Sequence, residues 1–386
     1  MSPALFQPLA LRGLTLKNRV VISPMCTYSA TNGVANDFHF VHLGRFALGG
    51  AGPVIVEATA VQPEGRISHG DMGLWNDAQI APLARIAAFL KQQGAAAGIQ
   101  LAHAGRKASM QRPWEGNGPL GEADFARGDH AWPIVAPSAE PVDAGWLTPR
   151  EMSLDDIETL KHDFRAAARR AAKAGFDVLE LHSAHGYLLH SFLSPLSNHR
   201  QDGYGGDRAG RMRLPLEVAG ALREAWPQSR PMFVRISSVD GVENGWSIDD
   251  SIAFASKLRA LGIDVIDCSS GGIATSPTAS IVPRGYGFQV GFAQQLRAAA
   301  DIKSMAVGLI VDAQQAEQVL QRGQADLIAI GREALADPNW PVQAHTALLA
   351  DAPPKDRYAD WPPAFGWWLG RRAATMEKLR AWKEGG

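Results

Sequence analysis

Residues 153–187 read SLDDIETLKHDFRAAARRAAKAGFDVLELHSAHGY, and the order of elements in this stretch decides the fold class. Ser153 is a typical helix N-cap, the alanine-rich run after it has helical periodicity, and Gly175 is a typical helix end. The apolar run that begins at Asp177 then predicts a buried strand. The stretch is therefore one helix followed directly by one strand.

Short apolar runs of this kind recur along the whole chain, and each is followed by helical periodicity. Repeated strand–helix units predict an α/β fold, a closed (β/α)8 TIM barrel. An open doubly wound sheet is the alternative, but no Gly-x-Gly-x-x-Gly follows the first strand, and 386 residues suit a barrel with insertions. The eight predicted strands are 20–25, 53–59, 98–103, 177–182, 231–237, 265–270, 304–309 and 326–331.

Three segments lie outside the repeat. Residues 5–19 alternate in polarity and turn at Gly13, which predicts an N-terminal β-hairpin that closes the barrel floor. Residues 105–150 are rich in Gly, Pro, Trp and charge, and an aperiodic insertion of this length after the third strand predicts a lid. Residues 351–386 carry many aromatics, so we expect them to pack, for example at a subunit interface. No linker is visible, and we expect a single domain over 1–386.

The composition is that of an ordinary globular protein, with 46% hydrophobic residues, 20% charged residues and a net charge of -1. No basic block and no apolar run of roughly 18 residues is present, so we expect neither nucleic acid nor a membrane as partner. No secretory signal is visible, and a cytoplasmic location is expected. With only Cys26 and Cys268, an iron–sulfur cluster is excluded, and any redox chemistry requires an organic cofactor.

Functional side chains in a TIM barrel gather where strands end, and the fourth predicted strand ends in an unusual group. His182 and His185 offer two N–H donors for one oxygen, and Tyr187 offers a proton. Residues three apart on a strand face opposite ways, so the histidines converge only if a helical turn follows directly after Leu181, a bend that Gly186 permits. Half of a metal site is the alternative, but the spacing suggests no third ligand, and no metal is expected.

The other strand ends are also rich in polar and flexible residues. The last two strands end in glycines and an arginine, the groups with which many barrels bind a phosphate. These ends comprise Ser23, Pro24, Met25, Cys26, Thr27 and Tyr28; Glu57, Ala58 and Thr59; Gln100, His103 and Arg106; Arg235; Val307 and Gly308; Gly331 and Arg332.

Five sequence motifs, three of them at strand ends, together resemble one family, the Old Yellow Enzymes, which are FMN-dependent ene-reductases. They are Leu-Lys-Asn-Arg at 16–19, Ser-Pro-Met-Cys at 23–26, His-Ala-Gly-Arg at 103–106, His-x-x-His-Gly-Tyr at 182–187 and Tyr-Gly-Gly at 204–206. The resemblance covers nearly the whole chain. Within the family the chain is similar to the thermophilic-like and xenobiotic reductase A-like class, although residues 207–211 depart from the usual Ser-x-x-Asn-Arg.

The resemblance implies that FMN lies non-covalently across the barrel mouth. Arg235 would place a permanent positive charge near the flavin pyrimidine ring, favouring its reduced form. The implied cofactor-binding residues are Ser23, Pro24, Met25, Cys26, Ala58, Gln100, Arg235, Val307, Gly308, Gly331 and Arg332.

The resemblance also implies a reaction. NADPH or NADH reduces FMN, and hydride then passes to the β-carbon of an α,β-unsaturated carbonyl compound such as an enone, enal or maleimide, with nitro compounds as further acceptors. His182 and His185 would hold the carbonyl oxygen, and Tyr187 would protonate the α-carbon. Cys26 and Tyr28 would border the substrate and tune the flavin or orient the carbonyl.

Trp368 resembles an aromatic residue that enters a neighbouring subunit's site, which suggests a homodimer or homotetramer. Trp361 and Trp367 are close enough in sequence to take the same place.

Three other functions are alternatives, and the residues weigh against two of them. A flavin-binding or sensor protein without significant turnover would keep the same cofactor site. An iron–sulfur flavoprotein of the dienoyl-CoA reductase or trimethylamine dehydrogenase type would need more cysteines than this chain has. A zinc-dependent barrel hydrolase would need a third metal ligand.

Overall fold

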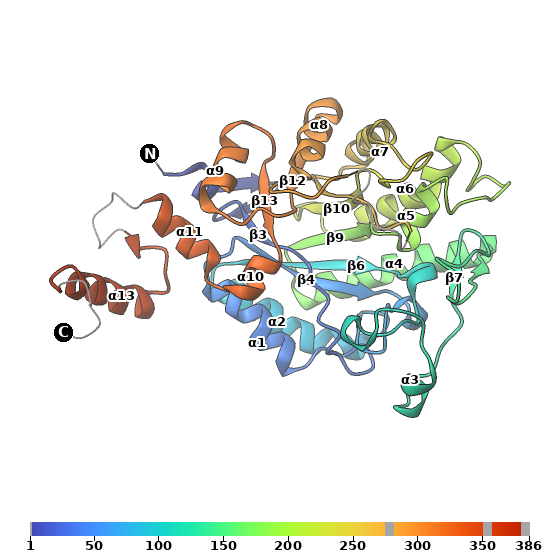
Figure 1. The fold of residues 1–386 in the computed structure, drawn as a ribbon, viewed down its shortest axis with the longest axis horizontal. Coiled ribbons are helices and arrows are strands. Elements are labelled where there is room, and N and C mark those ends of the chain that lie inside the picture. Colours follow the sequence, from blue (N-terminus) through green and yellow to red (C-terminus); the bar gives the residue numbers. More distant parts are fainter. Residues whose placement is uncertain (1, 275–281, 350–356, 380–386) are drawn as a thin grey trace.

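The computed structural model describes residues 2–274, 282–349 and 357–379. Within these ranges a nine-stranded sheet includes β5 (Met72–Gly73) as a short addition to β4, and the other strands form a closed parallel barrel (Figure 1). The first barrel strand pairs with both the second and the last, which confirms the (β/α)8 barrel. Around the barrel the strands are β3 (Val20–Ile22), β4 (Pro53–Ala60), β6 (Ala96–Ala102), β9 (Val178–Ser183), β10 (Met232–Ser237), β11 (Val265–Ser269), β12 (Lys303–Ala306) and β13 (Leu327–Ile330).

Helices connect successive strands and cover the outside of the barrel (Figure 1). The helix α4 illustrates how the sequence sets the limits and the packing of these helices. Its N-cap Ser153 accepts from the Asp156 N–H, and it ends at Gly175 with φ 90°. Its inner face buries Ile157, Leu160 and Phe164. The outer helices are α1 (Asp37–Leu48), α2 (Ile80–Gln92), α4 (Leu154–Ala174), α6 (Arg208–Ala225), α7 (Ile248–Ala260), α8 (Val290–Ala300), α9 (Ala313–Gln321) and α11 (Trp340–Leu348).

The N-terminal hairpin closes one end of the barrel as predicted. The antiparallel strands β1 (Leu9–Leu11) and β2 (Leu14–Leu16) follow a short 3-10 helix, Ala4–Phe6. Leu11 and Leu16 are buried in the same cluster as Val21, Phe233 and other side chains that fill the barrel interior. The hairpin therefore seals the end opposite the strand C-termini.

The insertion between β6 and α4 is built of short elements that stand off the barrel rim (Figure 1). Its Ala108, Met110 and Ile134 form a small buried cluster, against which Cys26 and Tyr187 pack. The predicted lid thus covers the side of the barrel mouth where the fourth strand ends. Its elements are Gly105–Lys107, Pro113–Glu115, α3 (Glu122–Ala126), β7 (Val135–Ala136) and β8 (Arg150–Glu151).

The C-terminal α13 (Pro363–Met376) projects away from the barrel (Figure 1). Its Trp367 and Trp368 are 56% and 68% exposed. In the part of the chain that the structure describes, no helix combines the length and apolar character needed to cross a membrane. The remainder of the predicted C-terminal segment, at 351–356 and 380–386, lies outside the described residues.

Candidate active site

The turn after β9 has a different shape from the one the sequence predicts. The helical turn expected directly after Leu181 is wrong, because β9 continues to Ser183 and the chain reverses over Ala184 to Tyr187. His185 and Gly186 both take left-handed conformations, with φ 60° and 76°. Glycine adopts this conformation freely, whereas a residue with a Cβ is strained by about 1 kcal/mol. The turn folds the His185 ring back towards His182.

His182 and His185 form a pair of donors with neutral rings. His182 Nδ1 accepts from the Ala184 N–H, so the ring hydrogen lies on Nε2, which is 3.4 Å from His185 Nδ1. Burial, reinforced by the charge of Arg235, lowers the pKa of both imidazoles well below the ordinary value. With the His185 hydrogen on Nδ1, one oxygen atom that lies about 3 Å from each nitrogen, to the side of the line joining them, can accept from both.

Tyr187 stands beside this pair, with its ring centroid 5.0 Å from that of His182. Burial raises the pKa of the phenol, so it keeps its proton throughout the neutral range. Lys107 donates to the carbonyl of His185 at 2.9 Å and lies over the Tyr187 ring. The turn therefore places a protonated phenol next to two neutral N–H donors.

Residues 23–28 leave the barrel because β3 ends at Ile22, three residues earlier than predicted. Thr27 anchors this segment by donating from its N–H and Oγ1 to Glu57 at 3.1 and 2.8 Å. Burial, with the nearby carboxyls of Asp71 and Glu57, raises the pKa of the Cys26 thiol well above its ordinary value. Cys26 is therefore a neutral thiol. Tyr28 lies next to Trp114 of the lid, with ring centroids 5.8 Å apart.

A cavity of about 490 Å³ opens at the strand C-termini, next to the histidine pair. Its lining contains Ser23, Pro24, Met25, His185, Arg235, Val307, Gly308, Gly331 and Arg332, all of which the sequence predicts. Val307 and Gly308 lie beyond the end of β12, which is three residues shorter at this end than predicted. The lining also contains Ser270, Gly272, Ala274, Val282, Arg284, Phe288, Gln289 and Leu309, which the sequence analysis did not assign.

The remaining predicted residues lie around the cavity rather than in its lining. The Ala58 backbone bonds to Cys26, and Gln100 donates from its amide to Glu180 Oε1 at 2.7 Å. Trp368 lies on the exposed α13 and does not line the cavity of its own chain.

Arg235 is held from inside the barrel by a buried carboxylate. Its Nε lies 3.2 Å from Asp267 Oδ2, and its guanidinium also donates to Ser269 Oγ. Within the described residues, both Asp267 oxygens and Glu180 Oε2 make no hydrogen bond. Burial raises the pKa of both carboxyl groups against the opposing pull of Arg235. The guanidinium thus lines the cavity with acidic groups behind it.

Comparison with known proteins identifies the chain. A sequence model of the NADH:flavin oxidoreductase / NADH oxidase family matches residues 4–350. The chain belongs to this family. It is 43% identical over 360 residues to the NADPH dehydrogenase of Bacillus subtilis, spanning 93% of this chain and 99% of the relative. The NADPH dehydrogenase of Geobacillus thermodenitrificans is 45% identical over 350 residues, spanning 90% and 95%.

Two solved structures show the same architecture as this chain. Morphinone reductase superposes with a TM-score of 0.73 at 27% identity, over 90% of each chain. The Old Yellow Enzyme homologue of Zymomonas mobilis has a TM-score of 0.71 at 26% identity, over 91% of this chain and 94% of that one. The resemblance to Old Yellow Enzymes is confirmed: the protein is an NAD(P)H-dependent flavin oxidoreductase with FMN as cofactor.

The cavity residues fit the FMN of this family. A Cβ at Gly308, where φ is 112°, would meet Gln289 Nε2 at 2.7 Å, so only a bare backbone fits there. The lining supplies the guanidinium groups of Arg235, Arg284 and Arg332, which suit a phosphate and an electron-rich ring edge. In the described part of the chain, the buried Ser23 Oγ has no hydrogen-bond partner. Among those residues, no group of three or more His, Cys, Asp or Glu is placed to hold a metal ion.

Three of the cavity residues that the sequence did not predict differ in the signal that was available for them. Ser270 and Gly272 follow β11, whose polar and glycine-rich end resembles the other strand ends and was the available signal. Gln289, by contrast, carries no local signal. Its amide joins Ser270 Oγ to the Val307 carbonyl, at 2.6 and 3.0 Å, which only the folded chain reveals.

The buried Glu57 generates a pH-dependent prediction. Burial raises its pKa from 4.5 to about 8, against the hydrogen bonds from Thr27. Between these values the folded protein holds a proton that the unfolded chain has released, so the free energy of unfolding falls as pH rises. Glu57→Gln has the shape of the protonated carboxyl and cannot ionise. Between about pH 6 and pH 8, we expect the free energy of unfolding of the wild type to fall by about 2 kcal/mol more than that of Glu57→Gln, measured by urea unfolding.

The control for this measurement is Glu243→Gln, because Glu243 is exposed. Its stability should follow the wild-type pH dependence. Parallel curves for the wild type and Glu57→Gln would mean that Glu57 ionises equally easily in both states.

Proposed function

We propose that the protein is an ene-reductase. It reduces the carbon–carbon double bond of α,β-unsaturated carbonyl compounds by adding a hydride at the β-carbon and a proton at the α-carbon. The observation that carries the proposal is the neutral pair His182 and His185, with facing nitrogens 3.4 Å apart, beside the protonated Tyr187. When bound, FMN supplies the hydride, which it takes from NADPH or NADH.

The two histidines bind the carbonyl oxygen of the substrate. Hydride addition to the β-carbon moves negative charge onto this oxygen, and N–H donors fixed beforehand stabilise that charge without reorganising. Because the pKa of both rings is lowered, they donate without carrying a charge of their own. A donor of this kind contributes roughly 3 kcal/mol to stabilisation of the transition state.

Tyr187 delivers the proton. The raised pKa of its phenol keeps the proton in place until a strong base meets it, and the α-carbon of an enolate is such a base. Cys26 and Tyr28 pack against the same small apolar cluster under the lid as Tyr187. Together they form an apolar border suited to the hydrocarbon part of an enone, enal or maleimide.

The comparisons support a nicotinamide reductant and a small organic acceptor. Morphinone reductase is a structural neighbour, and one of its structures is a complex with tetrahydroNAD, at 27% identity and a TM-score of 0.73. The curated relatives are named NADPH dehydrogenases. Nitro compounds are further acceptors, since their oxygens can occupy the same position between the two histidines.

The first test of the proposal is anaerobic oxidation of NADPH with 2-cyclohexenone as acceptor. We expect turnover by the wild type, and His182→Ala or His185→Ala should each slow reoxidation of the flavin about 100-fold because a donor is lost. Binding of p-hydroxybenzaldehyde, followed by its charge-transfer band, should weaken in parallel while FMN stays bound. His185→Asn, which restores an N–H donor, should recover part of the rate.

A wild type that NADPH reduces, but that no enone, enal or maleimide reoxidises, would contradict the proposal. That result would favour the alternative of a flavin-binding or sensor protein without significant turnover.

Tyr187→Phe is the second test, because it removes only the phenolic proton. We expect α-carbon protonation to slow by about 10- to 100-fold, with loss of a defined configuration at that carbon when the reaction runs in D2O. Tyr28→Phe is the matched control, since Tyr28 shares the apolar border but is not assigned the proton. Unchanged rate and configuration in Tyr187→Phe would assign proton delivery to water.

We also propose that a second copy of this chain covers α13. Trp367 and Trp368 pack edge to face with centroids 4.5 Å apart, and both remain exposed on their own chain. The segment before α13 is tied to α11 by the bond from Thr346 Oγ1 to the Arg357 carbonyl, at 3.0 Å. An exposed aromatic face on an anchored helix favours self-association, as a homodimer or homotetramer.

The exposed tryptophan face of α13 can be tested by the mass of the protein in solution. Trp368→Ala and Trp367→Ala should shift the wild-type dimer or tetramer towards monomer, measured by size-exclusion chromatography with light scattering. Trp114→Ala is the control, because Trp114 is 66% exposed but lies on the lid. A monomeric wild type would contradict this proposal and leave the ene-reductase proposal intact.

A further inference from the structure

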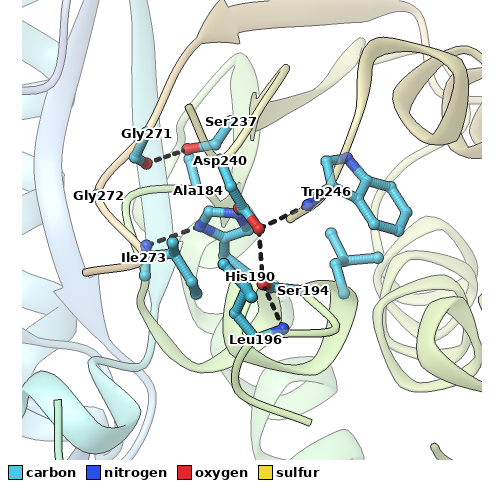
Figure 2. Close-up of polar contacts among 12 residues, drawn as sticks. Ala184, His190, Ser194, Leu196, Ser237, Asp240, Trp246, Gly271, Gly272 and Ile273 are labelled. Atoms are coloured by element: carbon cyan, nitrogen blue, oxygen red, sulfur yellow. Dashed lines mark hydrogen bonds and ion pairs between the residues drawn. The ribbon is translucent and has the colours of Figure 1, made fainter. Parts of the chain in front are cut away.

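A fully buried histidine–carboxylate pair, His190 and Asp240, lies next to the turn that carries His185 and Tyr187. Figure 2 shows this pair and its polar contacts. His190 is on α5 (Leu188–Leu193), which begins directly after Tyr187. Its Nδ1 accepts from the Gly186 N–H at 2.8 Å, and its Nε2 lies 2.8 Å from Asp240 Oδ1. Asp240 follows β10, so the pair connects the turn to the neighbouring strand of the barrel.

The direction of every hydrogen bond in this network is determined. A backbone N–H can only donate, so His190 Nδ1 carries no hydrogen and Nε2–H donates to Asp240. Asp240 Oδ2 accepts from the Trp246 N–H and from Ser194 Oγ, both at 2.6 Å. Although burial alone would raise it, the pKa of Asp240 is held below its ordinary value by these donors. Asp240 is thus a carboxylate that selects one tautomer of His190.

His190 holds one side of a single peptide unit. Lys107 donates to the carbonyl of His185, while His190 accepts from the N–H of Gly186. Both polar groups of the peptide unit between His185 and Gly186 are therefore hydrogen-bonded to side chains. Ser237 Oγ accepts from the N–H of His185 at 2.9 Å. The strained left-handed His185 is therefore held by side chains from three other elements, as residues of this kind require.

We propose that His190, kept in its Nε2–H tautomer by Asp240, is a positioning residue that fixes the turn between His185 and Tyr187. The inference rests on the proposed function, because the groups it positions are the oxygen-binding histidine and the proton donor. His190 itself touches neither substrate nor cofactor. Its action passes through the orientation of the His185–Gly186 peptide.

Asp240→Asn tests the tautomer without changing size or shape. The Trp246 N–H cannot reverse, so the oxygen of the new amide must take the place of Oδ2, and its NH2 group then faces His190. His190 Nε2 must accept from this group, which moves the ring hydrogen to Nδ1. Two donors, His190 Nδ1–H and the Gly186 N–H, then oppose each other, and the hydrogen bond to the turn is lost.

We expect Asp240→Asn to slow flavin reoxidation by 2-cyclohexenone and to weaken binding of p-hydroxybenzaldehyde, each by about tenfold or more. Reduction by NADPH should change less than about threefold, because that step does not use Tyr187 as a proton donor. Ser251→Ala is the matched control: it removes buried hydrogen bonds to Trp246 Nε1 and the Ser238 carbonyl but touches no part of the turn. It should lower stability while leaving both half-reactions unchanged.

His190→Asn separates positioning from stability. The Asn oxygen can accept from the Gly186 N–H in place of Nδ1, and an amide has no tautomers. His190→Asn should therefore keep activity near that of the wild type, whereas His190→Ala should lose activity. Adding Asp240→Asn to His190→Asn should lower activity little further. The proposal is overturned if Asp240→Asn slows reoxidation equally in the wild type and in His190→Asn. It is also overturned if Asp240→Asn and Ser251→Ala slow reoxidation in proportion to the stability that each loses.

Failure of the two proposals can be told apart. A wild type that does not reduce 2-cyclohexenone refutes the ene-reductase proposal. Binding of p-hydroxybenzaldehyde needs no turnover, and its dissociation constants across the same variants still decide whether His190 positions the turn.

Discussion

The closure of the barrel through β3 is the constraint on which the site depends. This strand pairs with β13 at Val20, Val21 and Ile22, and with β4 through Ile22 alone. The pairing joins the chain's first barrel strand to its last, so segments about 300 residues apart in sequence, such as Ser23 and Gly331, meet at one cavity. Because β3 is so short, the residues after Ile22 are free to leave the sheet and form the cavity wall.

Electrostatically, the site consists mainly of groups that burial keeps uncharged. The pKa of both histidines is lowered, and the pKa of Cys26 and of Tyr187 is raised, so none of the four carries a charge at neutral pH. The permanent charge of Arg235 is balanced inside the barrel by Asp267. These four side chains add little field of their own, in contrast to the guanidinium groups that line the cavity, and they respond most strongly to charge that develops during the reaction.

The sequence predicts features that depend on local patterns and misses those that depend on contacts between strands. The α4 limits at Ser153 and Gly175 follow from capping rules, and the strand positions follow from apolar runs. The shape of the turn after β9 could not be predicted, because it depends on pairing with β10 and on side chains such as Ser237 and His190 that hold the turn. The predicted strand ends located the cavity residues Arg235 and Gly308, whereas the link through Gln289 has no sequence signal.

The small cluster beneath the lid has a consequence for how the protein opens. Ile67, Ala104, Ala108, Met110 and Ile134 form a buried cluster separate from the two clusters of the barrel. A segment with so little apolar surface of its own unfolds locally at a lower free energy than the barrel. Proteases and hydrogen exchange will therefore reach the lid before the barrel. An apolar ligand beside Cys26 and Tyr187 enlarges this cluster, and the lid becomes more ordered when the site is filled.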